Sequence, residues 1–234
     1  MAIFNIAGYQ FVPLSQLTSL REELLMLCKN LSLKGTILLS TEGINLSLAG
    51  SLENIQNFKS TLKQNFHLSP SFRESTSDTI PFKRLKVKLK KEIITLKEDH
   101  IHPEQEKAPY ISPEIFKQWL DEKRDVIVLD TRNDYEIDFG TFENAVNLHL
   151  KHFNEFPLKS HHLEKNIPIV TFCTGGIRCE KAALYLLKKG YPCVYQLEGG
   201  ILNYFKQVGG THYQGKCFVF DDRIAIDANF SNYL

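Results

Sequence analysis

Three short apolar segments in the second half of the chain constrain its fold more than any other feature. Residues 126–129, 167–172 and 192–197 are hydrophobic almost throughout, without the alternation that marks a half-exposed strand. A segment with helical spacing, residues 179–189, separates the last two of them. Buried strands that alternate with helices are typical of a parallel sheet covered on both faces. We therefore predict an α/β domain with a parallel sheet over residues 113–215.

The first part of the chain orders its elements differently. Four segments have the composition of strands, namely residues 3–12, 35–40, 44–49 and 82–95. Two segments carry apolar residues at helical spacing, namely residues 15–31 and 51–65. The Thr-Glu-Gly sequence at residues 41–43 separates the two middle strands and indicates a hairpin. This βαββαβ order predicts a ferredoxin-like (acylphosphatase-like) α+β sandwich over residues 1–98.

Between the two predicted domains lies a segment without regular spacing. Residues 99–112 contain two prolines and little apolar periodicity, so we predict a linker there. Ser112 and Pro113 then form a favourable helix start, because serine caps the first turn and proline suits the first helical position. We interpret residues 216–234 as a C-terminal extension of the second domain.

Composition places the chain among ordinary globular proteins. Hydrophobic residues make up 43% of the 234 residues and charged residues 24%, which excludes wholesale disorder. No apolar run approaches the roughly 18 residues that a membrane span requires, so we expect no membrane segment. The first residues lack the basic and small-residue pattern of a signal peptide, and we expect a cytoplasmic location.

The cysteines and histidines give no sign of a metal centre. The five cysteines are an odd number without a Cys-x-x-Cys pair, which argues against a disulfide framework and a ribbon-type zinc site. His149 and His152 lie close in sequence, but no carboxylate stands at the spacing of a facial iron triad. No flavin fingerprint is present either, so we expect neither a metal nor a bound cofactor.

One strand–loop–helix stretch carries the chemistry. An apolar strand ends at Cys173, a short loop with Gly175 and Gly176 follows, and an amphipathic helix comes next. The glycines allow successive backbone N–H groups to turn inward, and the helix N-terminus adds positive potential. Arg178 adds a full positive charge within the same loop. These effects favour a thiolate, so we predict that Cys173 is a nucleophile with a lowered pKa.

The length of this loop separates two reaction classes. Four residues lie between Cys173 and Arg178. Tyrosine-phosphatase-like enzymes have a loop one residue longer, which fits a tetrahedral phosphate, whereas the present loop resembles that of rhodaneses, which suits a single sulfur or a persulfide. The predicted active-site loop consists of Thr174, Gly175, Gly176, Ile177 and Arg178. The alternative is a structural cysteine buried at a strand end before a glycine-rich turn.

A second stretch, residues 129–147, also resembles a rhodanese pattern, in which an Asp-x-Arg sequence precedes a Gly-x-Phe turn. Asp130, Arg132 and Glu136 look like an ion-pair network that fixes this segment. We predict that the three residues support the active-site loop, and a direct catalytic role is the alternative. Residues 197–201 resemble the Leu-x-Gly-Gly turn near the end of a rhodanese domain.

Four sequences occur together and in order along the chain, namely residues 41–45, 130–136, 173–182 and 217–223. The combination resembles the rhodanese-containing, oxygen-dependent tRNA uridine hydroxylases, bacterial enzymes that convert the wobble uridine to 5-hydroxyuridine. The resemblance implies an oxidoreductase that uses Cys173, with tRNA as its partner and molecular oxygen as co-substrate. Longer members continue past this last motif, which implies a tail that is absent or removed here. We predict no stable protein partner.

Two other functions fit the same loop. A rhodanese sulfurtransferase would move sulfur through a Cys173 persulfide to a small acceptor or to tRNA. A non-catalytic rhodanese-like binding module would need neither Cys173 nor Arg178, and the presence of both disfavours it. Cys179 is a possible second thiol that would resolve an oxidised or persulfidated Cys173. Packing at the start of the helix is the alternative role for Cys179.

A basic stripe precedes the predicted linker. Residues 82–91 alternate with period two, so that one face of the strand carries Arg84, Lys86, Lys88 and Lys90. Residues 1–100 contain 13 Lys and Arg against 9 Asp and Glu, a difference of +4, whereas residues 101–234 contain 15 against 18, a difference of −3. The stripe matches a phosphate backbone and predicts tRNA binding. The alternative is an edge strand that lysines protect against aggregation.

Overall fold

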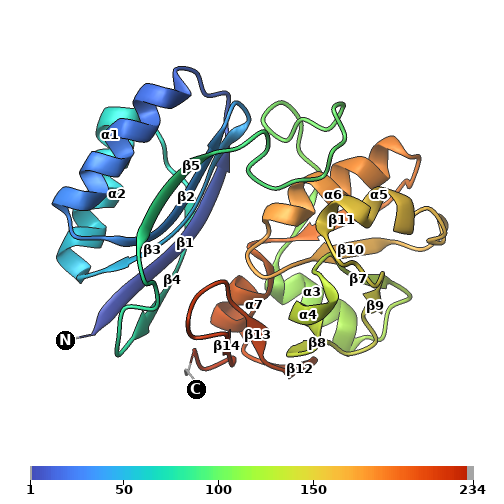
Figure 1. Ribbon diagram of the computed structural model, residues 1–234. Coiled ribbons are helices and arrows are strands. Elements are labelled where there is room, and N and C mark those ends of the chain that lie inside the picture. Colours follow the sequence, from blue (N-terminus) through green and yellow to red (C-terminus); the bar gives the residue numbers. More distant parts are fainter. Residues whose placement is uncertain (1, 231–234) are drawn as a thin grey trace. The chain divides into compact units, whose positions relative to one another are not determined.

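A computed structural model describes residues 2–230 of the chain. The chain divides into two compact units between Ile94 and Thr95 (Figure 1). Each unit has its own sheet and its own hydrophobic core.

The first unit is a five-stranded sheet with two helices. Its elements are β1 (Ile3–Phe11), α1 (Leu17–Asn30), β2 (Lys34–Ser40), β3 (Gly43–Gly50), α2 (Leu52–Phe66), β4 (Ser71–Ser77) and β5 (Leu85–Leu89). The strand order is β4-β1-β3-β2-β5. The first four strands pair antiparallel in the ferredoxin-like order, which confirms the predicted fold class, and β5 adds a parallel edge strand beside β2.

Both helices cover the same face of this sheet (Figure 1). Leu24 of α1 and Phe58 of α2 are fully buried against strand residues such as Ile37 and Leu46. The Ser51 side chain accepts a hydrogen bond from the Asn54 N–H and so caps α2. Burial of these apolar helix faces, more than helix propensity, holds the helices in place.

The predicted hairpin lies between β2 and β3, and its geometry requires a glycine. Gly43 has φ 149°, and a Cβ there would lie 2.1 Å from the Gln10 carbonyl oxygen of β1. Any larger residue would therefore push β1 and β3 apart. The turn residue Glu42 accepts a hydrogen bond from the Ile93 N–H at 2.7 Å, which ties the hairpin to the end of the unit.

The strand that carries the basic stripe is shorter than predicted. It spans Leu85–Leu89 rather than residues 82–95, and it forms one edge of the sheet. Leu85 and Val87 pack on the core under the helices, but Leu89 is 42% exposed. The alternation therefore turns Lys86 and Lys88 toward the face that neither helix of this unit covers.

The second unit is built on a parallel sheet with the order β6-β11-β10-β7-β9. Its elements are β6 (Tyr110–Ile111), α3 (Pro113–Asp121), β7 (Ile127–Asp130), α4 (Asp134–Ile137), β8 (Gly140–Phe142), β9 (Val146–Asn147), η1 (Phe153–Glu155), α5 (Phe156–Lys159), β10 (Ile169–Phe172), α6 (Ile177–Lys188), β11 (Val194–Leu197), α7 (Gly200–Val208), β12 (Tyr213–Gly215), β13 (Cys217–Phe218) and β14 (Ala225–Ile226). The parallel α/β architecture is the one that the apolar strands predict. Every residue of β10 is buried, which explains why this strand shows no alternation.

The segment expected to link the domains packs on the second unit. Ile101 and Ala108 are buried, and the Ala108 carbonyl accepts a hydrogen bond from the Gln196 side chain at 3.1 Å. Lys188 at the end of α6 forms an ion pair with Glu106 at 2.9 Å. Because these contacts lie within the second unit, residues 101–108 are part of its structure.

The start of the predicted C-terminal extension also belongs to the second unit. Strands β13 and β14 form a short hairpin whose Cys217, Val219 and Ile226 side chains are buried in the domain core. Residues 231–234 of that extension lie outside the described residues. Within residues 2–230, no helix is long and apolar enough to cross a membrane.

Candidate active site

Cys173 lies directly after β10, at the carboxyl end of a central strand of the parallel sheet. Its side chain is buried, and its sulfur accepts a hydrogen bond from the Gly176 N–H at 3.1 Å. Gly176 has φ 102°, in the left-handed region, and precedes the first residue of α6. The local geometry that the sequence predicts is therefore present: strand, cysteine, glycine turn, helix.

The environment of Cys173 stabilises its thiolate. Burial by itself raises the pKa of a thiol. Here a hydrogen bond from Cys179, the positive charge of Arg178 and the backbone N–H groups of Arg178 and Gly176 outweigh burial, and they lower the pKa of Cys173 from 9.0 to about 6. A thiol with such a pKa is ionised at neutral pH and is a competent nucleophile.

Cys179 is the neutral partner of this thiolate. It is buried in the first turn of α6, and burial together with the adjacent Cys173 raises its pKa well above the ordinary value. The Cys179 thiol therefore donates its proton to the Cys173 sulfur in a hydrogen bond. The Thr131 hydroxyl lies 3.7 Å from the Cys179 sulfur on the other side. The structure thus brings the two thiols together.

Arg178 forms an ion pair with Glu136, and its Nε–H takes no part in this pair. Its two terminal nitrogens donate to the Glu136 carboxylate at 2.5 and 2.6 Å, in a bidentate pair that is 5% and 0% exposed. The Arg178 Nε–H is buried and has no hydrogen-bond partner among the described residues. A buried donor left unpaired costs about 1–3 kcal/mol, unless a ligand supplies the acceptor. Glu136 therefore leaves one buried donor of Arg178 without an acceptor.

The three residues predicted to support the loop belong to two separate ion pairs rather than one network, and Arg178 completes the second pair. Arg132 is fully buried and donates to both Asp130 carboxylate oxygens. Arg132 also donates to the Gly140 carbonyl at 2.7 Å, so this pair fixes the turn after α4. Glu136 instead accepts from the Asn133 N–H at 3.0 Å in the first turn of α4 and pairs with Arg178. Glu136 is therefore coupled to the active-site loop directly.

Sequence reasoning did not identify the role of α7. The Ile201 and Leu202 N–H groups at the start of this helix donate to the carbonyls of Cys173 and Thr174, at 2.9 and 3.1 Å. Gly200 has φ 66°, and a Cβ there would lie 2.3 Å from the Cys173 carbonyl oxygen. The Leu-x-Gly-Gly sequence could have indicated this contact, because its second glycine lets the start of α7 approach the active-site loop.

The structure places the remaining predicted residues as follows. Thr174, Gly175 and Gly176 form the loop, and Ile177 begins α6. Arg84, Lys86, Lys88 and Lys90 belong to the other unit. Over residues 2–230, no three His, Cys, Asp or Glu side chains gather at a spacing suited to a metal ion.

The two loop glycines should respond differently to substitution. Gly176→Ala puts a side chain at φ 102° and displaces the N–H that reaches the Cys173 sulfur. Losing this charge-assisted hydrogen bond should raise the pKa of Cys173 from about 6 to roughly 7–8. Thiolate ultraviolet absorbance measured against pH checks the shift.

Gly175→Ala is the matched control for that measurement. A Cβ at Gly175 would meet no atom within 4 Å, and this glycine does not need a positive φ. The Cys173 pKa should therefore stay near 6. Equal titration curves for the two alanine variants would show that the Gly176 N–H does not stabilise the thiolate.

A buried low-pKa cysteine between a parallel strand and a helix that supplies an arginine defines a rhodanese-type thiol site. Known families agree with this class: residues 112–207 match the rhodanese-like domain, and residues 3–93 match the UPF0176 acylphosphatase like domain. A rhodanese-related protein from Thermoplasma volcanium is 23% identical, with a TM-score of 0.38, over 43% of this chain and 94% of its own.

Relatives that span both units identify the family. A "tRNA uridine(34) hydroxylase" from Cupriavidus pinatubonensis is 49% identical over 98% of this chain and 84% of its own length. A protein of the same name from Bordetella petrii is 46% identical over 97% of this chain and 93% of its own length. The chain belongs to the tRNA uridine(34) hydroxylase family.

Proposed function

We propose that this protein hydroxylates the wobble uridine of tRNA at C5, with molecular oxygen as co-substrate and Cys173 as the reactive thiol. One combination of observations carries the proposal. The chain matches this family over both units, and the second unit holds a Cys173 thiol whose pKa is lowered to about 6. Because the substrate is tRNA, we place the enzyme in the cytoplasm.

The site suits addition of a sulfur nucleophile to a pyrimidine ring. In the proposed step the Cys173 sulfur bonds to uracil C6, and the ring electrons move to C5 and O4 as an enolate. The unused Arg178 Nε–H is a donor for that O4 oxygen. The C5 carbanion is then oxygenated, C5 loses its proton, and the sulfur–C6 bond breaks to return the thiolate.

The overall reaction requires a two-electron reductant besides oxygen. One oxygen atom becomes the C5 hydroxyl, and the other leaves as water after it receives two electrons and two protons. We assign the electrons and protons to two molecules of a small cellular thiol, which are oxidised to a disulfide, and the Cys173 thiolate is regenerated unchanged. Cys173 therefore acts as a covalent activator of the ring and not as the source of electrons.

Mass spectrometry of tRNA nucleosides tests this function. A strain that lacks the gene should lose 5-hydroxyuridine and its derivatives, and the wild-type gene should restore them. Loss of a thiolated nucleoside instead would establish the sulfurtransferase alternative, in which Cys173 carries a persulfide. Unchanged nucleosides would overturn both functions.

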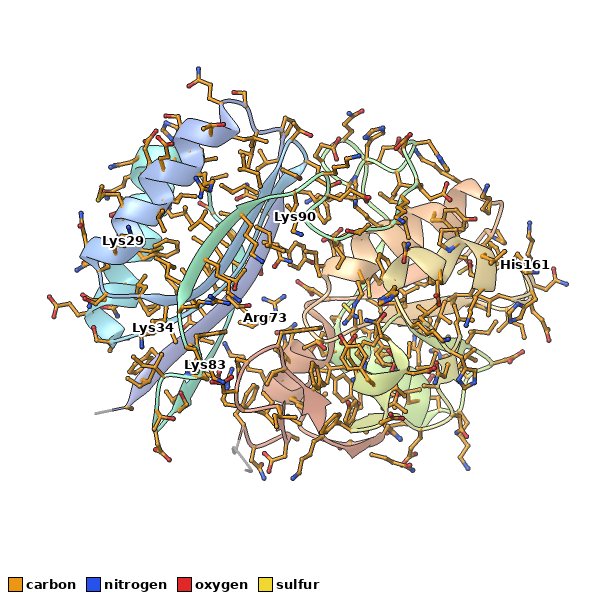
Figure 2. The ribbon with its side chains drawn as sticks, viewed as in Figure 1. Lys29, Lys34, Arg73, Lys83, Lys90 and His161 are labelled. Atoms are coloured by element: carbon orange, nitrogen blue, oxygen red, sulfur yellow. The ribbon has the colours of Figure 1, made fainter. Side chains whose placement is uncertain are left out.

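We further propose that tRNA phosphates bind to the face of the first unit's sheet that neither of its helices covers, here called the helix-free face. The strand register places Arg73 of β4 and Lys86 of β5 at opposite ends of one row across this face, with only small side chains between them. Figure 2 shows Lys90 and Lys83 toward opposite ends of the strands, with Arg73 between them. No strand residue on this face is a carboxylate, so the face suits a polyanion.

Replacing two lysines of the helix-free face by glutamine tests whether this face binds tRNA. Lys86→Gln with Lys88→Gln should weaken tRNA binding, because each lost phosphate contact lowers the slope of log K against log salt by roughly 0.7–0.9. Titrations of tRNA at several salt concentrations measure the slope. Neither lysine pairs with a carboxylate among the described residues, so unfolding free energy should change by less than about 1 kcal/mol.

Two lysines on the helices provide a matched control. Lys29 and Lys63 are exposed, in the last turns of α1 and α2, on the opposite side of the sheet. Lys29→Gln with Lys63→Gln makes the same charge change and should leave the slope near the wild-type value. Equal slopes for the two double variants would favour the edge-protection role of the lysines.

A further inference from the structure

Four aromatic side chains form a surface cluster that the proposed chemistry does not use. Phe218 of β13 is its centre, with ring centroids 5.4 Å from Tyr135, 5.5 Å from Phe139 and 5.1 Å from Phe220. Phe220, Tyr135 and Phe139 are 57%, 47% and 39% exposed. Among residues 2–230 they are three of the four exposed Phe, Tyr and Trp side chains. This aromatic cluster exposes apolar area that would ordinarily be buried.

The aromatic cluster is joined to the active-site loop. The Thr174 hydroxyl, one residue after Cys173, donates to the Phe218 carbonyl at 3.3 Å. The ring of Phe220 lies 5.9 Å from the Arg178 guanidinium, the group whose Nε–H has no partner. The exposed rings of the aromatic cluster therefore lie next to the proposed substrate site.

The hairpin that carries Phe218 and Phe220 is stabilised at its base and at its tip. Its base is anchored by buried Cys217. Its tip is closed by a Val219 N–H bond to the Ile224 carbonyl at 2.8 Å and by a 2.6 Å ion pair between Arg223 and Asp221. Phe220 protrudes between these contacts, so its exposure follows from the hairpin geometry. A backbone that is already ordered has less entropy to lose when the ring binds a ligand.

We propose that the aromatic cluster stacks the unpaired bases that flank the reactive uridine, an inference that rests on the proposed function. Exposed rings beside a nucleotide site serve as stacking platforms for single strands, because every base has a π-face. The exposed carboxylates Asp138 and Asp222 adjoin the rings in sequence and would repel phosphates. The cluster therefore receives base faces, while cations elsewhere hold the backbone.

Binding of a short RNA hairpin with uridine in its loop tests the proposal. A 2-aminopurine next to that uridine reports stacking through fluorescence quenching, and all proteins carry Cys173→Ser so that no turnover occurs. Phe220→Leu keeps an apolar side chain but removes the ring. It should weaken binding about 5- to 150-fold, the range for one lost base–aromatic stack, and it should abolish the quenching.

Two further variants separate stacking from other effects. Phe220→Tyr keeps the ring and should bind and quench like the parent protein. Leu158→Ala removes a 72% exposed apolar side chain from α5 and should also leave binding unchanged. A perfectly paired duplex of the same composition should not distinguish Phe220→Leu from the parent, because its base faces are covered.

Equal loop affinity for Phe220→Leu and the parent would overturn the proposal and would leave the cluster as a surface for a protein partner. The same holds if Phe220→Tyr is as weak as Phe220→Leu. Failure of the proposed function gives a different result, namely ring-dependent loop binding together with 5-hydroxyuridine levels that deletion of the gene leaves unchanged. Failure of the stacking proposal gives a Phe220→Leu protein with the RNA affinity of its parent, while deletion of the gene still removes 5-hydroxyuridine from tRNA.

Discussion

Replacing Cys173 by serine should abolish hydroxylation while the fold is retained. Serine is nearly isosteric with cysteine, so the buried site loses little packing volume. Its hydroxyl has a far higher pKa, and the backbone N–H of Gly176 and the charge of Arg178 cannot ionise it at neutral pH. Loss of a nucleophile on which the mechanism depends costs about a thousandfold or more in rate. The 5-hydroxyuridine content of tRNA from a complemented deletion strain measures the loss.

The same variant isolates the titration of the reactive thiol. Because the pKa of Cys173 is lowered to about 6, the wild-type protein should hold about nine-tenths of this group as thiolate at pH 7. The difference in thiolate absorbance between wild type and Cys173→Ser should rise with pH around 6 and be complete before pH 8. Burial raises the pKa of Cys28 and of Cys217 to about 12, so neither contributes in this range.

Cys193→Ser is the control for loss of a thiol as such. Cys193 is half-buried directly before β11 and lies outside the active-site loop. This variant should retain wild-type 5-hydroxyuridine levels. Full activity in a folded Cys173→Ser protein would refute the assignment of the nucleophile. A loss of equal size in Cys193→Ser would show that the assay responds to stability rather than to chemistry.

Local parts of the fold and site were predictable because short-range physics determines them. The apolar run that ends at Cys173, the glycine turn and the following helix are adjacent in sequence, and each has its own signal. The hairpin around Gly43 is equally local, since its backbone needs a φ that glycine readily adopts. Such segments adopt the expected structure whichever elements later pack against them.

Contacts between distant segments were not predictable in the same way. Glu136 meets Arg178 across 42 positions, so sequence spacing grouped this carboxylate with its neighbours Asp130 and Arg132 instead. The Ile201 N–H at the start of α7 donates to the Cys173 carbonyl. In the sequence, only the Leu-x-Gly-Gly pattern indicated that α7 would approach the active-site loop. Which side chains meet at a parallel sheet's carboxyl end depends on strand order, which one sequence does not specify.

The β13–β14 hairpin shows a third kind of limit. Its strands have two residues each, too short for a period to be recognised. Their burial comes from contacts with the rest of the core, not from their own composition. The assignment of tRNA binding to Lys86 and Lys88 stays a prediction, because an edge strand is also where protective lysines occur.

Breaking the Arg178–Glu136 pair should be the largest single perturbation of stability at the site. Both partners are almost fully buried, and removal of either leaves an uncompensated charge in the core. Arg178→Met and Glu136→Met should each lower the unfolding free energy by about 3–5 kcal/mol, the usual cost of orphaning a buried ion. Denaturant unfolding curves measure the change. Lys117→Met, which breaks an exposed pair with Asp121, should cost only about 0–1 kcal/mol.

The double variant separates stability from chemistry. Arg178→Met with Glu136→Met removes both charges at once, so it should recover most of the stability that either single variant loses, because methionine fills the space without a buried ion. Hydroxylation should stay absent, since the Nε–H donor is gone and the pKa of Cys173 rises from about 6 without the arginine charge. A double variant that regains both stability and 5-hydroxyuridine formation would show that the pair only holds the fold. A double variant that is stable, inactive and high in thiol pKa would establish Arg178 as a part of the reacting site.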